Sequence, residues 1–191
     1  RAGADQVLKP AMELGGNAPL IVFDDADLDQ AVEGAMLAKM RNLGEACTAA
    51  NRIYVHKDLA DAFTDRLCAA MGKLKMGNGL DPDVAVGPLV NADTRDKVKG
   101  FVEDAVAKGA ELRLGGTLPE GKGFYYPPTV LTSVPETADC VHDEIFGPVA
   151  AIQTFDDTDD VIRRANDTEY GLVAYVFSGD FKRGLQVSER L

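Results

Sequence analysis

The sequence predicts an α/β fold with an open, largely parallel sheet flanked by helices. Apolar runs of strand length alternate with longer segments in which apolar residues recur at helical spacing, and turn-forming residues separate most of them. Strands that alternate with helices in this way are typical of βαβ units and of a parallel sheet. The 191 residues are enough to bury a core in one large domain or two small ones.

Each element expected in the first half of the chain follows from a local pattern. The apolar run 19–23 predicts a buried strand, and the acidic segment 24–27 that follows can cap a helix over 28–40. The apolar positions of this helix recur at helical spacing: Leu28, Val32, Met36 and Met40. A second strand is expected over 52–55 and a second helix over 58–71, with Leu59, Phe63 and Leu67 on one face.

The second half of the chain repeats the alternation after a loop. The segment 73–90 is rich in Gly, Asp and Pro and is expected to be mostly loop. Helical spacing then predicts a helix over 92–108, which Gly109 is placed to end. Further strands are expected at 111–114, 129–134, 149–155 and 172–177. Further helices are expected at 159–166 and from Asp180 onward, and the segment 115–126 is expected to be rich in turns.

Composition and charge exclude several classes of function. A hydrophobic content of 46% with 27% charged residues is ordinary for a globular protein, and the net charge of −11 argues against nucleic acid or an anionic membrane surface as a partner. No apolar run has membrane-spanning length and no signal-peptide pattern is present, so a cytoplasmic protein is expected. Three cysteines without metal-ligand spacing indicate a reduced compartment, and two histidines make a histidine-based metal site unexpected.

Cys47 lies on a short Gly/Ala segment between an expected helix and an expected strand. Its small neighbours leave room for a ligand to reach the sulfur, and backbone N–H groups at a turn can lower a thiol pKa and hold a developing oxyanion. A single cysteine is more often a small buried hydrophobic residue, which is our interpretation of Cys68 and Cys140. The neighbouring motifs therefore decide how Cys47 is interpreted.

Two other segments place a carboxylate beside a glycine turn that leads into a strand. Glu13 is followed by Leu-Gly-Gly-Asn-Ala-Pro, and Glu144 is followed by Ile-Phe-Gly-Pro-Val. In the order Glu-Leu-Gly-Gly, Gly-x-x-Cys, Glu-Ile-Phe-Gly-Pro, the chain resembles the aldehyde dehydrogenase superfamily, and the resemblance extends over essentially all 191 residues.

The resemblance implies how the chain is organised. Residues 1–191 correspond to the catalytic domain, without the N-terminal Rossmann-like cofactor domain and the C-terminal segment that helps to build a homo-oligomer (a dimer or tetramer). We find no Gly-x-Gly-x-x-Gly motif in the sequence. The expected partners are a small aldehyde and NAD or NADP, with no metal, nucleic acid or membrane.

The resemblance also implies the roles of particular residues. Cys47 corresponds to the nucleophile, which forms a hemithioacetal and then a hydrolysable thioester, and Glu13 corresponds to the general base that activates water. The cofactor is expected to contact Leu14 and Gly15 beside the nicotinamide, Glu144 at the hydroxyls of the nicotinamide ribose, and Phe146, which would pack against that end of the cofactor.

Arg41, six residues before Cys47, is the candidate for substrate selection. In succinate-semialdehyde dehydrogenases, which this segment resembles, an arginine at this spacing binds the distal carboxylate of the substrate, as a bidentate guanidinium can. The alternative is a surface arginine that is favourable at a helix C-terminus.

Glu45 differs from the family's commoner glutamine and would tend to raise the pKa of the Cys47 thiol. Ala49 stands where some relatives have a second cysteine, so no disulfide within this loop is available.

Two rival interpretations remain open. The chain could be a thiol hydrolase in which His56 or His142 activates Cys47, which requires a histidine beside the sulfur. Alternatively, the chain by itself could be an inactive structural domain, because little in it would hold the cofactor. Within the dehydrogenase interpretation, another short semialdehyde or an aliphatic aldehyde is the alternative substrate.

Overall fold

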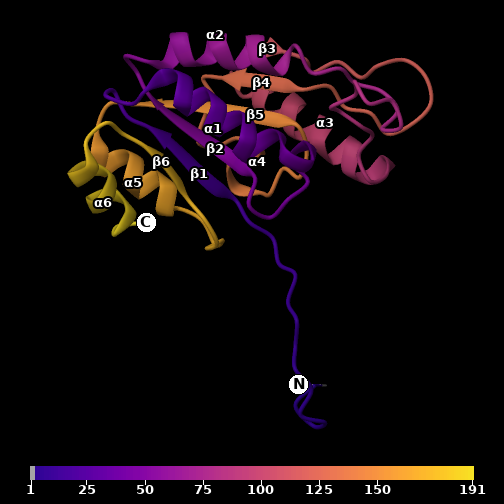
Figure 1. Cartoon of the computed structure of the whole chain (residues 1–191), viewed down its shortest axis with the longest axis horizontal. Helices are drawn as coiled ribbons and strands as arrows, with labels where there is room; N and C mark the ends of the chain where they lie inside the picture. Colours follow the sequence, from indigo (N-terminus) through magenta and orange to yellow (C-terminus); the bar gives the residue numbers. More distant parts are fainter. Residues whose placement is uncertain (1–2) are drawn as a thin grey trace.

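A computed structural model describes residues 3–191 as one six-stranded sheet covered by helices on both faces (Figure 1). The strand order is β3-β4-β5-β2-β1-β6, and only the pair β3–β4 is antiparallel. The strands are β1 (Ala18–Val22), β2 (Ala50–His56), β3 (Glu111–Leu114), β4 (Thr129–Thr132), β5 (Val149–Phe155) and β6 (Tyr175–Phe177). This architecture confirms the predicted fold class.

The helices begin where the sequence offers side-chain caps. They are α1 (Leu28–Met40), α2 (Ala60–Met71), α3 (Ala92–Ala107), α4 (Asp139–His142), α5 (Thr158–Asn166) and α6 (Phe181–Ser188). Side-chain oxygens of Asp27, Asn91, Asp157 and Asp180 accept hydrogen bonds from backbone amides in the first turns of α1, α3, α5 and α6. These bonds satisfy amides that have no partner within the helix.

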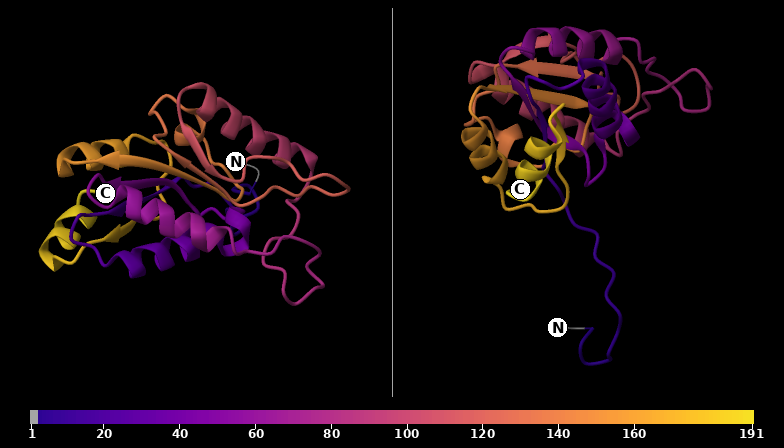
Figure 2. Two further views of the ribbon diagram at one scale, coloured as in Figure 1. Left: turned by 90° about the horizontal axis from the view of Figure 1, so that it is seen from above. Right: turned by 60° about the vertical axis from the view of Figure 1, so that its left-hand side comes forward.

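Alternate residues of the strands build the core on two sides of the sheet. Leu20, Ile53 and Ile152 pack on the face covered by α1 and α2. On the opposite face, one apolar cluster includes residues of α3 and α4 and a second includes residues of α5 and α6. Figure 2 shows this arrangement from two further directions. The four central strands, β4, β5, β2 and β1, are buried on both faces, as expected of a parallel sheet between helices.

Two strand predictions need correction, and two short elements were not predicted. The strand expected over 172–177 begins only at Tyr175, and the one expected over 129–134 ends at Thr132. Two short helices were not predicted: α4, a single turn that is too short for helical periodicity to show, and the 3₁₀ turn η1 (Arg41–Gly44).

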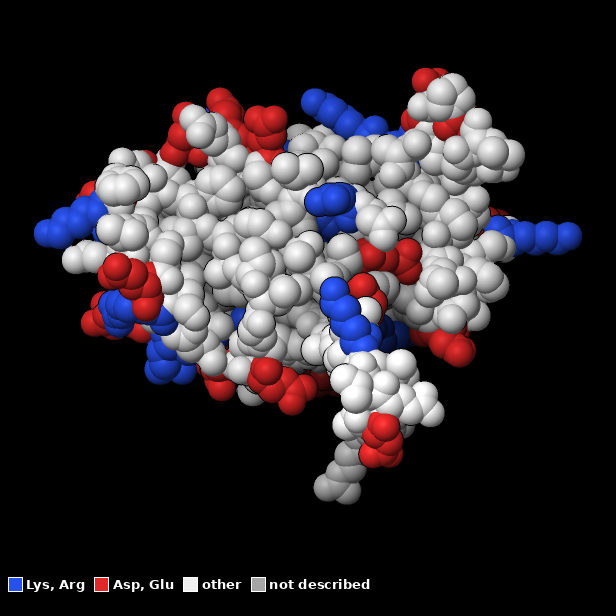
Figure 3. Space-filling view, turned by 60° about the horizontal axis from the view of Figure 1, so that its bottom comes forward, with Lys and Arg blue, Asp and Glu red and all other residues white. Residues whose placement is uncertain are grey.

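The start of the described chain lies outside the globular body. Residues 4–15 are exposed, and the part of this segment before the glycine turn runs away from the sheet as a tail (Figure 1). Viewed from the side of this tail, uncharged side chains occupy most of the centre of the body, and most charged side chains lie towards its margin (Figure 3). Among the described residues, we find no helix with the length and apolar character needed to cross a membrane.

Candidate active site

The predicted site residues lie in segments that each lead directly into a parallel strand. Glu13 and Gly15 precede β1, Cys47 precedes β2, and Glu144 precedes β5. Parallel strands all start at the same edge of the sheet, so the segments that enter them come together there. The topology thus brings three motifs that are far apart in the sequence to the amino-terminal edge.

Cys47 and Glu13 line the same cavity at this edge. The cavity has a volume of about 580 Å³; Leu14 and Gly15 also line it. Cys47 is half-buried, whereas Glu13 is exposed, so the sulfur is reachable from a space that solvent can enter beside the carboxylate. The structure therefore places the predicted nucleophile, the predicted base and two predicted cofactor contacts around one opening.

The remaining wall of the cavity was not predicted from the sequence. It is formed by 169–172, the segment just before β6, which includes Glu169 and Tyr170. The apolar character of Leu172 favours a strand, whereas this residue lies in the loop before β6, at the same edge. The position of the segment 169–172 could have revealed its role, because, like the other site segments, it leads into a strand of the parallel sheet.

Glu144 is anchored on the glycine turn that follows Glu13. The backbone N–H of Gly16 donates a hydrogen bond to Glu144 Oε1 (2.9 Å), and Lys97 Nζ donates to the Glu144 carbonyl oxygen (3.2 Å). A Cβ atom on Gly15 would lie 2.9 Å from Glu144 Oε2 and 3.2 Å from Tyr170 Cε1. Only glycine therefore allows the carboxylate and the tyrosine ring to approach the turn this closely.

The glycine turn also packs directly against the Cys47 loop. A Cβ atom on Gly16 would overlap the carbonyl oxygen of Cys47, so no larger residue fits there. On the other side of the loop, the hydroxyl of Tyr175 donates a hydrogen bond to the Thr48 carbonyl oxygen (2.8 Å). These contacts hold the backbone at Cys47 and at the residue that follows it.

Left-handed backbone conformations flank the site. Asn42 and Leu43 in η1 have φ values of 50° and 59°, and Phe146 has φ 54°. Each costs about 1–2 kcal/mol for a residue other than glycine, and such strain gathers at functional sites where the surroundings enforce it. Here each of the two turns forms part of the surroundings of the other, because a Cβ on Gly44 would overlap the carbonyl oxygen of Gly147. The turn before Cys47 and the turn after Glu144 are thus packed against each other.

Comparison with known proteins decides the family. A family model described as "Aldehyde dehydrogenase family" matches residues 1–191. The chain belongs to the aldehyde dehydrogenase family. It is 54% identical over 185 residues to a succinate-semialdehyde dehydrogenase of Paenarthrobacter nicotinovorans and 49% identical over 188 residues to a glutarate-semialdehyde dehydrogenase of Pseudomonas putida. These matches cover 97% and 98% of this chain, but only 41% and 39% of the two relatives.

A solved family structure has the same fold. The crystal structure of succinate-semialdehyde dehydrogenase from Burkholderia pseudomallei superposes with a TM-score of 0.94 at 47% sequence identity. The match covers 98% of this chain and 39% of that chain. The 191 residues therefore correspond to well under half the length of these family members.

Three of the predicted site residues, Arg41, Glu144 and Phe146, lie outside the lining of the cavity, and so does Glu45. Arg41 is exposed at the start of η1, on the far side of the left-handed turn from Cys47, and its substrate role stays a prediction. Phe146 is half-buried in the turn that follows Glu144. Glu45 Oε1 accepts a hydrogen bond from the backbone N–H of Val90 (3.1 Å), which directs this carboxylate towards the 73–90 loop.

Neither histidine lies beside the sulfur. His56 ends β2 whereas Cys47 precedes it, and a seven-residue strand spans about 20 Å. His142 is exposed at the end of α4, and its carbonyl oxygen accepts a hydrogen bond from Asn17 Nδ2 (3.3 Å). Neither lines the cavity that contains Cys47, so this geometry does not favour the thiol-hydrolase interpretation.

The other two cysteines have the properties of structural thiols. Burial raises the pKa of Cys140 to about 12 and also raises the pKa of Cys68, so both thiols are neutral at physiological pH. Neither lines the Cys47 cavity. Within residues 3–191, no group of three or more His, Cys, Asp and Glu side chains is arranged to hold a metal ion.

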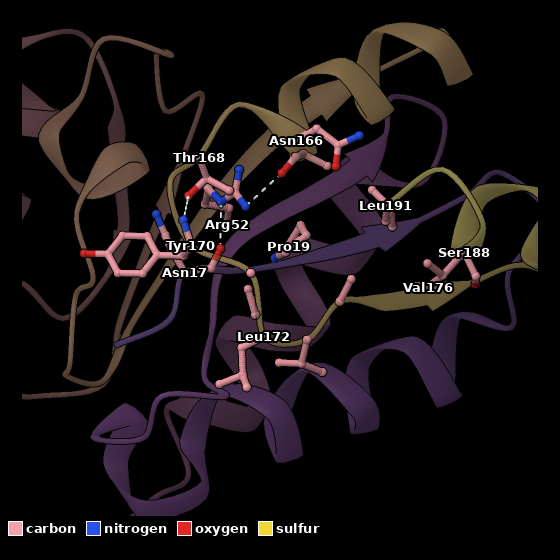
Figure 4. A pocket seen from close by; sticks show the side chains of 15 residues that line it. Asn17, Pro19, Arg52, Asn166, Thr168, Tyr170, Leu172, Val176, Ser188 and Leu191 are labelled. Carbon is pink, nitrogen blue, oxygen red and sulfur yellow. Dashed lines mark hydrogen bonds between the residues drawn. The ribbon is translucent and has the colours of Figure 1, made fainter. Parts of the chain in front are cut away.

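A second cavity, of about 430 Å³, lies next to the first and shares the segment 170–172 with it (Figure 4). The guanidinium of Arg52 is buried in its lining. It donates hydrogen bonds to the carbonyl oxygens of Asn17 (2.9 Å), Arg164 (3.1 Å) and Ala165 (3.0 Å). Arg52 therefore ties β2 to the start of β1 and to the C-terminal end of α5, where a cation is favourable.

Lys39, near the end of α1, is completely buried (0% exposed). Its Nζ donates a hydrogen bond to Asn51 Oδ1 (2.9 Å). Burial lowers the pKa of Lys39 to about 7, while the nearby Cys140 and Glu144 side chains oppose this shift. The buried amine is thus close to its titration point at neutral pH.

This pKa predicts a pH-dependent stability. Between about pH 7 and 10.5 the unfolded chain binds a proton at Lys39 that the folded chain does not, so stability rises with pH by up to about 1.4 kcal/mol per pH unit from this group. Lys39→Met should lack that contribution. The unfolding midpoints of the two proteins should be compared from pH 6 to 10. As the pH rises, the midpoint of the wild-type protein should increase relative to that of Lys39→Met. A constant difference would contradict the low pKa.

Proposed function

We propose that the whole protein containing these residues is an NAD(P)-dependent aldehyde dehydrogenase that oxidises succinate semialdehyde to succinate through Cys47. The observation that carries the proposal is the shared cavity: Cys47 and Glu13 line one opening whose wall is the glycine turn that holds Glu144. Family membership and the semialdehyde dehydrogenases among its relatives support the reaction class and the substrate.

The residues of this chain can supply the covalent chemistry. The Cys47 sulfur adds to the aldehyde carbon, and the Cys47 backbone N–H helps to hold the resulting oxyanion. A bound nicotinamide cofactor would supply the hydride acceptor, so that loss of hydride from the adduct would leave an acyl thioester on Cys47. Glu13, exposed to solvent in the same cavity, then takes a proton from the water that hydrolyses the thioester.

The glycine turn fits the nicotinamide end of the cofactor. Gly15 presents no side chain to the cavity, and Glu144 has one oxygen fixed by the Gly16 N–H. Its second oxygen has no hydrogen-bond donor among the described residues, so it can accept a ribose hydroxyl. Leu14 and Phe146 complete the proposed contacts. NAD and NADP share this half of the molecule and differ at the adenosine ribose, so both fit.

Arg41→Ala tests the substrate. In the whole protein, loss of a charge-assisted contact to the distal carboxylate should lower kcat/KM for succinate semialdehyde by about 30- to 1000-fold. The value of kcat/KM for butanal, which has no carboxylate, should change little. Initial rates with both aldehydes decide the matter. An equal, small loss on both would make Arg41 a surface residue at the end of α1, and would favour another semialdehyde contact or an aliphatic aldehyde as the substrate.

The 191 residues alone are expected to be inactive. The proposed cofactor contacts in this chain are confined to the nicotinamide end, and the matched relatives are more than twice as long. We propose that the whole protein is a cytoplasmic homo-oligomer in which the remainder supplies the other contacts. A titration of the isolated chain with NAD or NADP should show no tight binding; saturation at micromolar cofactor would contradict this expectation.

A further inference from the structure

A lysine occupies a position on the buried face of α1, where apolar residues are usual. Ala31, Ala35 and Lys39 follow one another at intervals of four on the buried face of the helix. A buried ammonium is costly unless it is paired, and the described residues offer Lys39 no carboxylate within ion-pair distance. An apolar side chain would suit this position better if stability alone were at stake.

The hydrogen bonds of Lys39 lead to the active site. Its Nζ donates to Asn51 Oδ1 (2.9 Å), and Asn51 Nδ2 donates to the carbonyl oxygen of Gly16 (3.4 Å). The N–H of Gly16 in turn donates to Glu144 Oε1 (2.9 Å). Asn51 itself is 1% exposed, so solvent does not compete for these bonds.

The chemistry of the three groups fixes the orientation of the amide. Lys39 Nζ is the donor in its contact with Asn51, and a carbonyl oxygen can only accept hydrogen bonds. The side chain between Lys39 and Gly16 must therefore accept on one side and donate on the other, as the amide of Asn51 does. An aspartate could keep the contact with Lys39 but would present an acceptor to the Gly16 carbonyl.

We propose that Lys39 and Asn51 are positioning residues: the buried amine orients the Asn51 amide, which holds Gly16 so that its N–H anchors Glu144 for the cofactor. This inference rests on the proposed function. Because Gly16 also packs against the Cys47 carbonyl, the same hydrogen-bond chain sets the distance between the cofactor contact and the nucleophile. The cost of burying Lys39 is then explained by its effect on the site.

The experiment compares Asn51→Asp and Lys39→Met in the whole protein. Asn51→Asp should weaken binding of NADH or NADPH about tenfold, because it removes the donor to Gly16. The KM for the aldehyde should change less. The unfolding midpoint of Asn51→Asp should not fall, since the introduced carboxylate still pairs with Lys39. At pH 7, Lys39→Met should give a smaller loss of cofactor affinity without loss of stability, whereas a merely structural role would lower stability at this pH and leave affinity unchanged.

Hydrogen exchange supplies a readout that needs no cofactor. The amides of residues 15–17 should exchange faster in both variants, and more so in Asn51→Asp. Lys57→Met is the control: Lys57 is an exposed lysine paired with Asp156 after β2, and its loss should alter neither exchange nor cofactor binding. Unchanged exchange and affinity in Asn51→Asp would overturn the inference. A wild-type protein that neither binds cofactor nor oxidises aldehydes would overturn the proposed function, and with it the catalytic purpose of these residues.

Discussion

Replacing Cys47 with alanine is expected to lower kcat for aldehyde oxidation by at least about 10⁴-fold in the whole protein, as loss of a covalent nucleophile does in other enzymes. No other cysteine lines the cavity, so none can substitute for it. Initial rates with saturating aldehyde and cofactor measure the loss. Cofactor affinity should be retained, because the Gly16–Glu144 contact does not involve the sulfur.

Cys68 supplies the matched control for this experiment. It lies in α2, is half-buried like Cys47, and has a pKa raised by burial. Cys68→Ala should leave kcat within a factor of two of wild type. If Cys47→Ala kept a tenth or more of the activity, the covalent mechanism would have to be abandoned.

Glu13→Gln is the second large expected effect. Removing a general base typically lowers the rate by about 10²–10⁴-fold. The loss should fall on hydrolysis of the thioester, because the first addition depends on Cys47. Stopped-flow measurements should therefore show a burst of about one equivalent of reduced cofactor per site, followed by slow turnover that hydroxylamine accelerates by attacking the thioester.

Replacement of Glu169 tests whether Glu13 is the carboxylate that acts as the general base. It lines the same cavity from the segment before β6 and differs from Glu13 in having no predicted role. Glu169→Gln should reduce kcat much less than Glu13→Gln and should give no burst. The reverse ranking would transfer the role of base to Glu169.

Local patterns in the sequence were sufficient to predict most of the architecture. The strand β1 is a plain apolar run, and Asp27, in the acidic segment expected to cap a helix, caps α1. The meeting of the three motifs also follows from sequence, because each directly precedes a strand and the alternation implies parallel strands. Ligands in open α/β sheets commonly bind at the carboxyl edge, so the amino-terminal edge is the less expected location.

What the sequence could not predict depends on long-range packing. Tyr170 approaches Gly15 only because β6 pairs with β1, which brings the segment before β6 to the cavity. The left-handed turn at Asn42 and Leu43, which separates Arg41 from Cys47 along the chain, has no strong local signal. Lys39, by contrast, did leave a signal, since a charged residue breaks the buried i, i+4 row of α1.

The most direct test of the central claim is to look for the acyl group on Cys47. Whole Glu13→Gln protein, mixed with cofactor and succinate semialdehyde and quenched in acid, should be analysed by peptide mass spectrometry. The account predicts a succinyl thioester on the peptide that contains Cys47, absent when either reactant is omitted. Reduced cofactor formed at the enzyme's concentration with Cys47 unmodified, or with the acyl group on Cys68 or Cys140, would contradict it.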